Sequence, residues 1–269
     1  MVVRNEVRQL EQVAVVDPIW GSLLNEARSA ASQDPFLAAF FYSTVLNHPS
    51  LEASVIYRIC ELLDHPDMQA VLLRQTFDEM LKDWPEWGTI LRVDIQAVYD
   101  RDPACTRFME PVLYFKGFHA IQTHRLAHWL LKKGRKDFAL YLQSRASVVF
   151  QTDINPAAQI GRGIFLDHAT GLVVGETAVI GDNVSILHGV TLGGRQHGDV
   201  GARLGQRHRD MRGDEGGSGT PLEAVGYDDG HQIFPCEPRS DKWRSMARTS
   251  CCCAPPRRSA GMLAAGPLP

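Results

Sequence analysis

The sequence lacks the features that mark several large classes of protein. No uninterrupted apolar run is long enough to span a bilayer, and the start, MVVRNEVRQLEQVAVVDPIW, has neither the apolar centre nor the small-residue cleavage site of a secretory signal. The formal net charge of −3 creates no field that would attract nucleic acid or an anionic membrane. We therefore expect a cytoplasmic protein with no nucleic-acid partner and no membrane partner.

The sequence also offers few of the residue patterns that bind metals. None of its six cysteines forms a C-x-x-C pair, so a zinc site of the common spacing is not predicted. His124 and His128 lie four residues apart on a predicted helix and could clamp a metal, but no third ligand follows at a suitable spacing. We expect no metal.

What is present first is a helical pattern over residues 1–150. Asp17-Pro18 and Asp34-Pro35 combine an acidic cap with a proline suited to the first helical turn. Further start signals precede apolar residues at helical spacing, and the predicted helices begin at Pro49-Ser50, at Pro66-Asp67, at Pro111 (ending at Lys133) and at Asp137 (ending near Phe150). Stripes this regular predict a packed all-α domain.

The apolar period changes to six at Asp153. The residues in this phase are Ile154, Ile160, Leu166 and Leu172 and, after a shift of two, Val174, Ile180, Ile186 and Leu192. Glycine, asparagine and other turn residues fill the intervening positions. A period of six is typical of the hexapeptide repeats of a parallel β-helix, which we predict over residues 151–194. A set of short buried strands in an ordinary sheet is the alternative.

Residues 195–269 do not continue the repeat. They contain seven Leu, Ile or Val in 75 positions, against fourteen in the 44 positions of residues 151–194. Such a segment buries too little apolar surface to offset the entropy of ordering. We expect it to be disordered or poorly ordered.

Asp167 and His168 stand out from the small residues around them. A turn of a β-helix needs small or polar residues, whereas histidine is the side chain best suited to proton transfer near neutral pH. Asp153 precedes His168 by nearly one coil of three hexapeptides, so its carboxylate could orient the imidazole. A surface histidine beside a solvated aspartate is the alternative.

Several of these segments resemble the serine O-acetyltransferase family. The run DINPAA from Asp153, followed by IGRGIFLDHATGLVVGETAVIGDNVSILHGVTLGG, is similar to that family nearly residue for residue. Upstream, DIQAVYDRDPA (94–104) and YFKGFHAIQTHRLAHWL (114–130) resemble its helical domain. The resemblance covers about residues 15–194 and implies a helical domain followed by a left-handed parallel β-helix. The combination of RDPA and LDHATG is specific within hexapeptide transferases, whereas the repeat alone is not.

The resemblance implies acetyl transfer from acetyl-CoA to the hydroxyl of L-serine, which gives O-acetyl-L-serine for cysteine biosynthesis. By carry-over, His168 is the general base and Asp153 orients it, while Asp102 and Asp167 hold the amino acid. The Arg207-His208 pair mimics a family pair that binds the substrate carboxylate, although its neighbours do not match. A serine hydroxyl is a weak nucleophile that needs a positioned base, and an ammonium group calls for carboxylates.

The resemblance also implies partners. Family active sites lie between adjacent prisms of a trimer, so we expect a homotrimer or a dimer of trimers. Gly193 and Gly194 would allow a pantetheine arm to approach the backbone, although tight turns use glycine too. His188 lies near the expected cleft, where a turn role is favoured over ligand contact.

Residues 195–269 depart from the family pattern, which continues with further coils and a tail that docks into O-acetylserine sulfhydrylase. Their arginine-rich texture with three adjacent cysteines resembles a coding sequence read out of frame. The missing coils would line the coenzyme A groove, so we expect weak acetyl-CoA binding or none. The end of the chain, from Gly266 to Pro269, does not match the docking tail, so we do not expect the sulfhydrylase as a partner.

Three functions therefore compete. The first is a serine O-acetyltransferase. The second is another hexapeptide O-acetyltransferase that acts on a sugar or antibiotic hydroxyl, against which RDPA and LDHATG together argue. The third is an inactive or scaffold-like hexapeptide protein, which the loss of the repeat favours.

Overall fold

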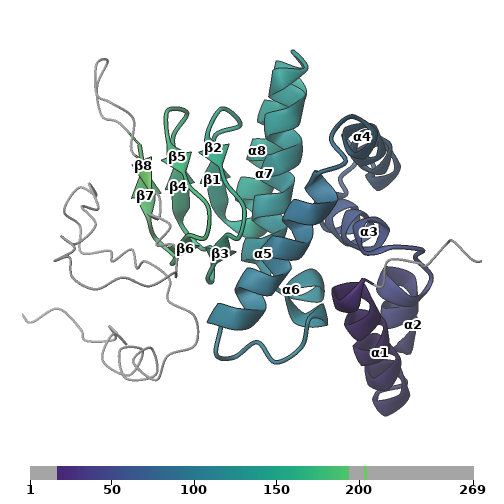
Figure 1. Ribbon diagram of the computed structural model, residues 1–269. Helices are drawn as coiled ribbons and strands as arrows, with labels where there is room; N and C mark the ends of the chain where they lie inside the picture. The colour runs from purple at the N-terminus through teal and green to yellow at the C-terminus, as the bar shows by residue number, and fades with distance from the viewer. Residues whose placement is uncertain (1–16, 194–202, 205–269) are drawn as a thin grey trace, which may run out of the picture. The chain divides into compact units, whose positions relative to one another are not determined.

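The computed structural model describes residues 17–193 and the backbone of residues 203–204. Helices come first along the chain: α1 (Pro18–Gln33), α2 (Ala38–Phe41), a π-helical turn (Tyr42–Leu46), α3 (Leu51–Leu63), α4 (Ala70–Asp83), α5 (Trp87–Arg101), α6 (Met109–Leu113), α7 (Lys116–Lys132) and α8 (Lys136–Phe150). Short strands follow: β1 (Thr152–Ile154), β2 (Gln159–Ile160), β3 (Phe165–Leu166), β4 (Leu172–Val174), β5 (Val179–Ile180), β6 (Ser185–Ile186), β7 (Thr191–Leu192) and β8 (Arg203–Leu204). Figure 1 shows the strands beside α5, α7 and α8.

Two helix starts follow directly from the sequence. The Asp17 carboxylate accepts a hydrogen bond from the Trp20 amide, and Pro18 occupies the first turn of α1, where its missing N–H costs nothing. The Ser50 hydroxyl accepts a hydrogen bond from the Ala53 amide at the start of α3. Each cap satisfies one backbone donor that the first turn of a helix leaves without a partner.

The predicted helix from Pro111 to Lys133 is two helices in the structure. α6 ends at Leu113, and Phe115 has extended backbone angles (φ −91°, ψ 106°) before α7 begins at Lys116. The interruption redirects the chain, so that Gly117 in the first turn of α7 lies against the backbone of Leu166. Periodicity misses this break because apolar residues continue on both sides of it. Helix α5 is likewise absent from the helices that periodicity predicts.

One hydrophobic core joins the helices to the strands. It includes fully buried side chains such as Phe77, Trp87 and Leu91 from the helices, and it continues into Leu172 and Ile186 from the strands. Burial of a side chain of this size contributes about 1.5–3 kcal/mol. Within residues 17–193, none of the helices combines the length and the apolarity that a bilayer span requires.

The strands form three parallel sheets that the chain visits in rotation. Sheet 1 has the order β1-β4-β7, sheet 2 the order β2-β5-β8, and sheet 3 pairs β3 with β6. Every strand pairing is parallel. One circuit is a set of three successive strands, one from each sheet. The aliphatic residues at spacing six all lie in strands, and all are buried except Ile160, which is partly buried.

The register explains the shift of two in the repeat. Ile154 pairs with Val174, and Val174 pairs in turn with Leu192, so the first circuit is longer than the second by two positions. The extra positions lie in the connection between Leu166 and Val174. That connection carries Asp167 and His168, so the phase shift in the sequence marks the turn of greatest chemical interest.

The strand pairing extends past Gly194, where the sequence prediction ended it. β8 pairs with β5, and Val179 is the partner of Arg203. Its residue Leu204 is in phase with the period of six, but glycine stands at the one repeat position between Leu192 and Leu204, so the aliphatic series is interrupted before the strand. The expectation of disorder for the rest of residues 195–269 falls outside the residues that the structure describes.

Candidate active site

The turn after β3 holds His168 in an unusual backbone conformation. His168 (φ 56°) and Ala169 (φ 59°) both lie in the left-handed region, which residues other than glycine rarely adopt. Strain of this kind, of order 1–3 kcal/mol for each residue, tends to occur at functional sites. The His168 side chain is 75% exposed, and its Nε2 lies 3.6 Å from Asp167 Oδ1. An exposed imidazole in a rigid, strained turn is available to a substrate.

Backbone hydrogen bonds tie this turn to the neighbouring circuits. The Asp167 amide donates to the Ile186 carbonyl at 2.8 Å, and the Gly171 amide donates to the Gln151 carbonyl at 2.8 Å. The Thr170 carbonyl accepts from the Gly189 amide at 2.8 Å. The turn is therefore held on both sides, which fixes the backbone from which the His168 side chain projects.

Asp102 belongs to the same cluster, although it lies far away in the sequence. It caps the C-terminus of α5, where its amide donates to the Val98 carbonyl and its carboxylate accepts from the Ala104 amide at 2.8 Å. Burial raises the pKa of the Asp167 carboxyl. The His168 ring lowers this pKa, while the charge of Asp102 raises it further. Two interacting carboxyl groups suit a ligand that carries a cationic group. The imidazole beside them suits a proton that the same ligand loses close to that group.

His188 also belongs to this cluster, although the sequence favours a turn role over ligand contact for it. Because Leu166 pairs with Ile186, His188 occupies in the second circuit the position that His168 has in the first. The two ring centroids lie 5.9 Å apart with an interplanar angle of 66°. The His188 ring also lowers the pKa of Asp167. The separation of His168 and His188 along the chain equals that of the paired residues Leu166 and Ile186. This equal spacing is the sequence signal that could have placed His188 beside His168.

Asp153 does not contact His168 within this chain. Its carboxylate Oδ1 accepts a hydrogen bond of 2.7 Å from Gln143 Nε2, and its strand partner is Val173 on β4. Val173 follows the His168 turn, so Asp153 lies on the face of sheet 1 and not at the turn itself. In a coil of three regular hexapeptides Asp153 would pair closer to the turn, but the first circuit is longer by two positions.

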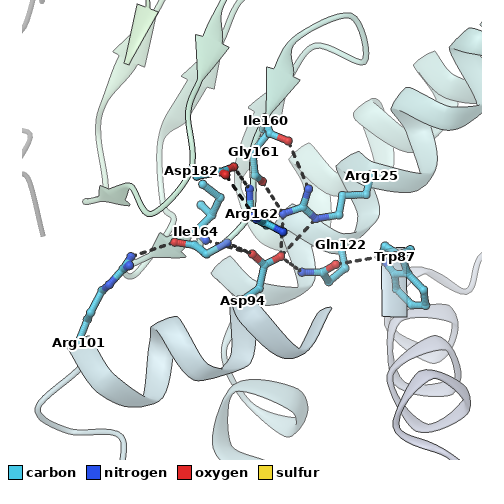
Figure 2. A network of polar contacts seen from close by, with 11 residues as sticks. Trp87, Asp94, Arg101, Gln122, Arg125, Ile160, Gly161, Arg162, Ile164 and Asp182 are labelled. Carbon is cyan, nitrogen blue, oxygen red and sulfur yellow. Dashed lines mark hydrogen bonds and ion pairs between the residues drawn. The ribbon is translucent and has the colours of Figure 1, made fainter. Parts of the chain in front are cut away.

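A buried network connects α5, and with it Asp102, to the strands. The Asp94 carboxylate is fully buried and accepts hydrogen bonds from Gln122 Nε2 at 2.8 Å and from Arg125 Nη2 at 2.7 Å. Its other oxygen accepts from the amides of Gly163 at 2.7 Å and Ile164 at 3.1 Å. Figure 2 shows this carboxylate between the Arg125 guanidinium and the turn before β3.

The same region holds two further links to that turn. Arg125 Nη2 donates to the Gly161 carbonyl at 2.8 Å, and Arg101, the last residue of α5, donates to the Gly163 carbonyl at 2.9 Å. Asp102 follows Arg101 directly. The position of the Asp102 carboxylate relative to His168 is therefore set by contacts of α5 with this turn that the sequence does not reveal, because the residues that Arg101 and Asp94 contact there are 62 to 70 positions away along the chain.

Of the two helical histidines, His124 is buried and His128 is partly buried. Burial lowers the pKa of His124 to about 3, and burial also lowers the pKa of His128, whose Nδ1 lies 2.7 Å from the Pro156 carbonyl. Within the described part of the chain, no group of three or more His, Cys, Asp or Glu side chains is arranged to hold a metal ion.

The remaining predicted site residues lie elsewhere. Gly193 stacks on Gly175 of the preceding circuit, where a Cβ on Gly175 would lie 3.3 Å from the Gly193 Cα. This close packing favours glycine at position 175, whereas a Cβ at position 193 would meet Gly175 only at an ordinary contact distance of 3.8 Å. Gly194, Arg207 and His208 lie outside the described residues.

Comparison with known proteins gives consistent matches. The family described as "Serine acetyltransferase, N-terminal" matches residues 19–123. A serine acetyltransferase of Salmonella typhimurium is 48% identical over 194 residues, which cover 72% of this chain and 69% of that protein. The serine acetyltransferase of Escherichia coli K12 is 47% identical over 194 residues, with the same coverage.

Solved structures agree with these matches. A serine acetyltransferase from Brucella abortus strain S19 is 69% identical, with a TM-score of 0.69 over 71% of this chain and 78% of that one. The Brucella abortus enzyme in complex with coenzyme A is 70% identical, with a TM-score of 0.67 over 68% of this chain and 74% of that one. A serine acetyltransferase in complex with cysteine is 46% identical, with a TM-score of 0.68 over 70% of this chain and 78% of that one.

Proposed function

The chain belongs to the serine acetyltransferase family, and from this premise we propose that it transfers an acetyl group from acetyl-CoA to the hydroxyl of L-serine with His168 as the general base. The product, O-acetyl-L-serine, is a precursor in cysteine biosynthesis. The observation that supports this reaction best is the gathering of Asp102, Asp167 and His168 at one turn, with the imidazole exposed and the carboxyl groups beside it.

The two carboxylates account for the recognition of an amino acid. The serine ammonium group binds between Asp102 and Asp167, because a cation relieves the repulsion that raises the pKa of Asp167. A substrate bound in this way presents its hydroxyl to the exposed ring of His168. His188, packed edge-on against that ring, restricts its orientation.

The chemical step requires one positioned base. A ring nitrogen of His168 takes the proton of the serine hydroxyl as the oxygen attacks the thioester carbonyl carbon of acetyl-CoA. The bond from carbon to sulfur then breaks, and the coenzyme A thiolate leaves with the bonding electron pair and takes up the proton that His168 holds. O-acetyl-L-serine and free coenzyme A are the products, and acetyl-CoA is the co-substrate.

Asp153 enters this scheme through a second copy of the chain. The three parallel sheets form a left-handed β-helix, and homotrimers place the face of sheet 1 of one copy beside the His168 turn of the next. The exposed carboxylate of Asp153 then orients the imidazole of a neighbouring copy and stabilises its protonated form. The place of Asp153 away from His168 within one chain, and its exposure beside Gln143, support this arrangement.

The contribution of the chain beyond Gly193 stays a prediction. Arg207 and His208 are proposed to bind the substrate carboxylate, and Gly193 and Gly194 to border the pantetheine arm. Binding of acetyl-CoA weaker than in the relatives, and the absence of a sulfhydrylase partner, follow from the departure of residues 195–269 from the family pattern.

A thiol-release assay with L-serine and acetyl-CoA tests the proposal. The full chain should release coenzyme A, and His168→Ala should lower kcat by about 10²–10⁴-fold, the usual contribution of a general base. His65→Ala is the matched control, because His65 is a partly exposed histidine of the helical region whose Nδ1 lies 3.1 Å from Asp67 Oδ2.

Release from neither the parent nor the variant would favour a scaffold protein. Release with a sugar or antibiotic acceptor but not with L-serine would favour a different hexapeptide acyltransferase. Equal rates for the parent and His168→Ala would remove His168 from the mechanism.

A further inference from the structure

The first turn of α7 lies against the strained turn that carries His168. A Cβ at position 117 would clash with the carbonyl oxygen of Leu166, so glycine is required there for the helix to approach β3. Lys116, the residue before it, is thereby placed at the edge of the His168 turn. The break between α6 and α7 is what allows this approach.

The Lys116 ammonium forms two hydrogen bonds at this edge. Its Nζ donates to Thr170 Oγ1 at 2.5 Å and to Gln151 Oε1 at 2.9 Å. The Thr170 hydroxyl in turn lies 3.2 Å from the carbonyl oxygen of His168 and 3.1 Å from Gln151 Oε1. A short path of hydrogen bonds thus connects the lysine side chain to the backbone of the proposed base.

Both hydrogen-bond partners that Lys116 has among the described residues are uncharged. A lysine side chain loses substantial rotamer entropy when it is fixed, and exposed ion pairs that order such chains contribute little to stability. Gln151 is also in the left-handed region (φ 61°), so the lysine joins two segments that are both strained. The hydrogen bonds of Lys116 are therefore suited to holding the backbone of both segments in the left-handed conformation.

We propose that Lys116, through Thr170 and Gln151, is a positioning residue that holds the turn of His168 in its left-handed conformation. This set of three residues is called the Lys116 latch. The inference deepens the proposed function and depends on it, since it takes His168 as the base. Without the latch the turn relaxes toward less strained backbone angles, and the imidazole loses its alignment with the serine hydroxyl.

The test compares Lys116→Met, which removes the donors but keeps the stem, with Lys116→Arg, which keeps donors. Lys116→Met should lower kcat roughly tenfold, because small misplacement of a catalytic group is costly, while the KM for acetyl-CoA and the Tm stay close to those of the parent. Lys116→Arg should restore most of kcat. Thr170→Val should resemble Lys116→Met, and the double variant should lose no more than either single variant, since both break one path.

A second readout does not depend on activity. Hydrogen–deuterium exchange of the amides in residues 167–171 of the full chain should speed up in Lys116→Met and Thr170→Val. Lys136→Met is the matched control, because Lys136 is an exposed lysine that begins another helix, α8. It should change neither exchange nor kcat.

These readouts separate the two proposals. If the parent releases no thiol, the proposed function fails, and the exchange data alone decide whether the latch exists. A kcat for Lys116→Met within twofold of an active parent, or exchange in residues 167–171 that matches the parent, would overturn the latch. Loss of kcat in step with a large fall in Tm, unrescued by Lys116→Arg, would also overturn it.

A second, independent observation concerns a small cavity between α7, α8 and β1. Its volume is about 10 Å³, and the polar residues His124, Thr152, Thr123 and Gln143 line it together with alanine and aliphatic side chains. His124 Nδ1 and Thr152 Oγ1 are buried and have no hydrogen-bond partner among the described protein atoms. Buried polar atoms of this kind are rare, and each calls for a partner.

We infer that this cavity binds one ordered water molecule that donates to His124 Nδ1 and bonds to Thr152 Oγ1. A cavity of roughly 10–15 Å³, measured as the space open to a water-sized sphere, holds a single water when it offers two to four polar partners. Burial lowers the pKa of His124 to about 3, against a smaller opposing effect of its hydrogen bond with the Ala158 backbone. The ring is therefore neutral, and one of its nitrogens must accept a hydrogen bond.

A crystal structure of the full chain at high resolution tests this inference. Density for one water within hydrogen-bond distance of both atoms is expected, and Thr152→Val should lose that density while Thr152→Ser keeps it. A dry cavity in the parent, with Thr152 Oγ1 turned to donate directly to His124 Nδ1, would overturn it.

Discussion

Replacement of Asp94 by alanine should destabilise the protein more than any exposed change on the same helix. The carboxylate is fully buried and accepts hydrogen bonds from Gln122, from two nitrogens of Arg125 and from the amides of Gly163 and Ile164. Removing one partner of a buried ion pair costs about 3–5 kcal/mol, because the other charge stays buried without compensation. The two amides add to this cost, and water entering the vacated space offsets part of it. We therefore expect a net loss of about 3–5 kcal/mol.

Urea unfolding at a fixed protein concentration measures this change in the free energy of unfolding. Asp100→Ala is the matched control, because Asp100 is exposed on the same helix and accepts only from Gln96 among the described side chains, and its cost should stay within about 0.5 kcal/mol. Arg125→Met in the Asp94→Ala background should recover part of the loss, since it removes the uncompensated charge.

A loss below about 1 kcal/mol for Asp94→Ala would refute this reasoning. It would mean that water solvates Arg125 and the turn before β3 as well as the carboxylate does. Greater destabilisation in the double variant than in Asp94→Ala would also refute it, because the guanidinium would then be stabilising without its partner.

Two further predictions concern the site itself. Burial raises the pKa of Asp167 above its unfolded value of 3.8, so the charged form costs stability at neutral pH. Asp167→Asn should therefore raise the Tm at neutral pH while thiol release is lost. The gain in Tm over the parent should shrink as the pH falls through the raised pKa of Asp167 toward 3.8. A gain in Tm that stays constant across that pH window would contradict the raised pKa. Gln143→Leu removes the donor to Asp153 and should lower kcat by roughly threefold to tenfold. Gln143→Glu should lower kcat further, because two carboxylates then face each other. A kcat for Gln143→Leu equal to the parent's would show that this hydrogen bond does not orient Asp153.

The sequence anticipated much of the fold because its signals are local. The caps at Asp17 and Ser50 act within one helical turn, and the spacing of six between aliphatic residues reflects very short strands. The family motif likewise lies in one continuous run around His168. Local patterns failed where the chain continues apolar through a change of direction, as at Phe115, and where glycine interrupts the aliphatic series before β8.

The sequence by itself determined the family, the reaction class and the Asp167-His168 pair, since each of these depends on residue types in short runs. Only the tertiary structure decided the geometry between runs. It placed the Asp153 carboxylate beside Gln143, His188 beside His168, Lys116 beside Thr170 and Asp94 beside the turn before β3. These relations depend on strand register and helix docking, which arise from contacts between residues far apart along the chain and therefore leave no periodic trace in the sequence.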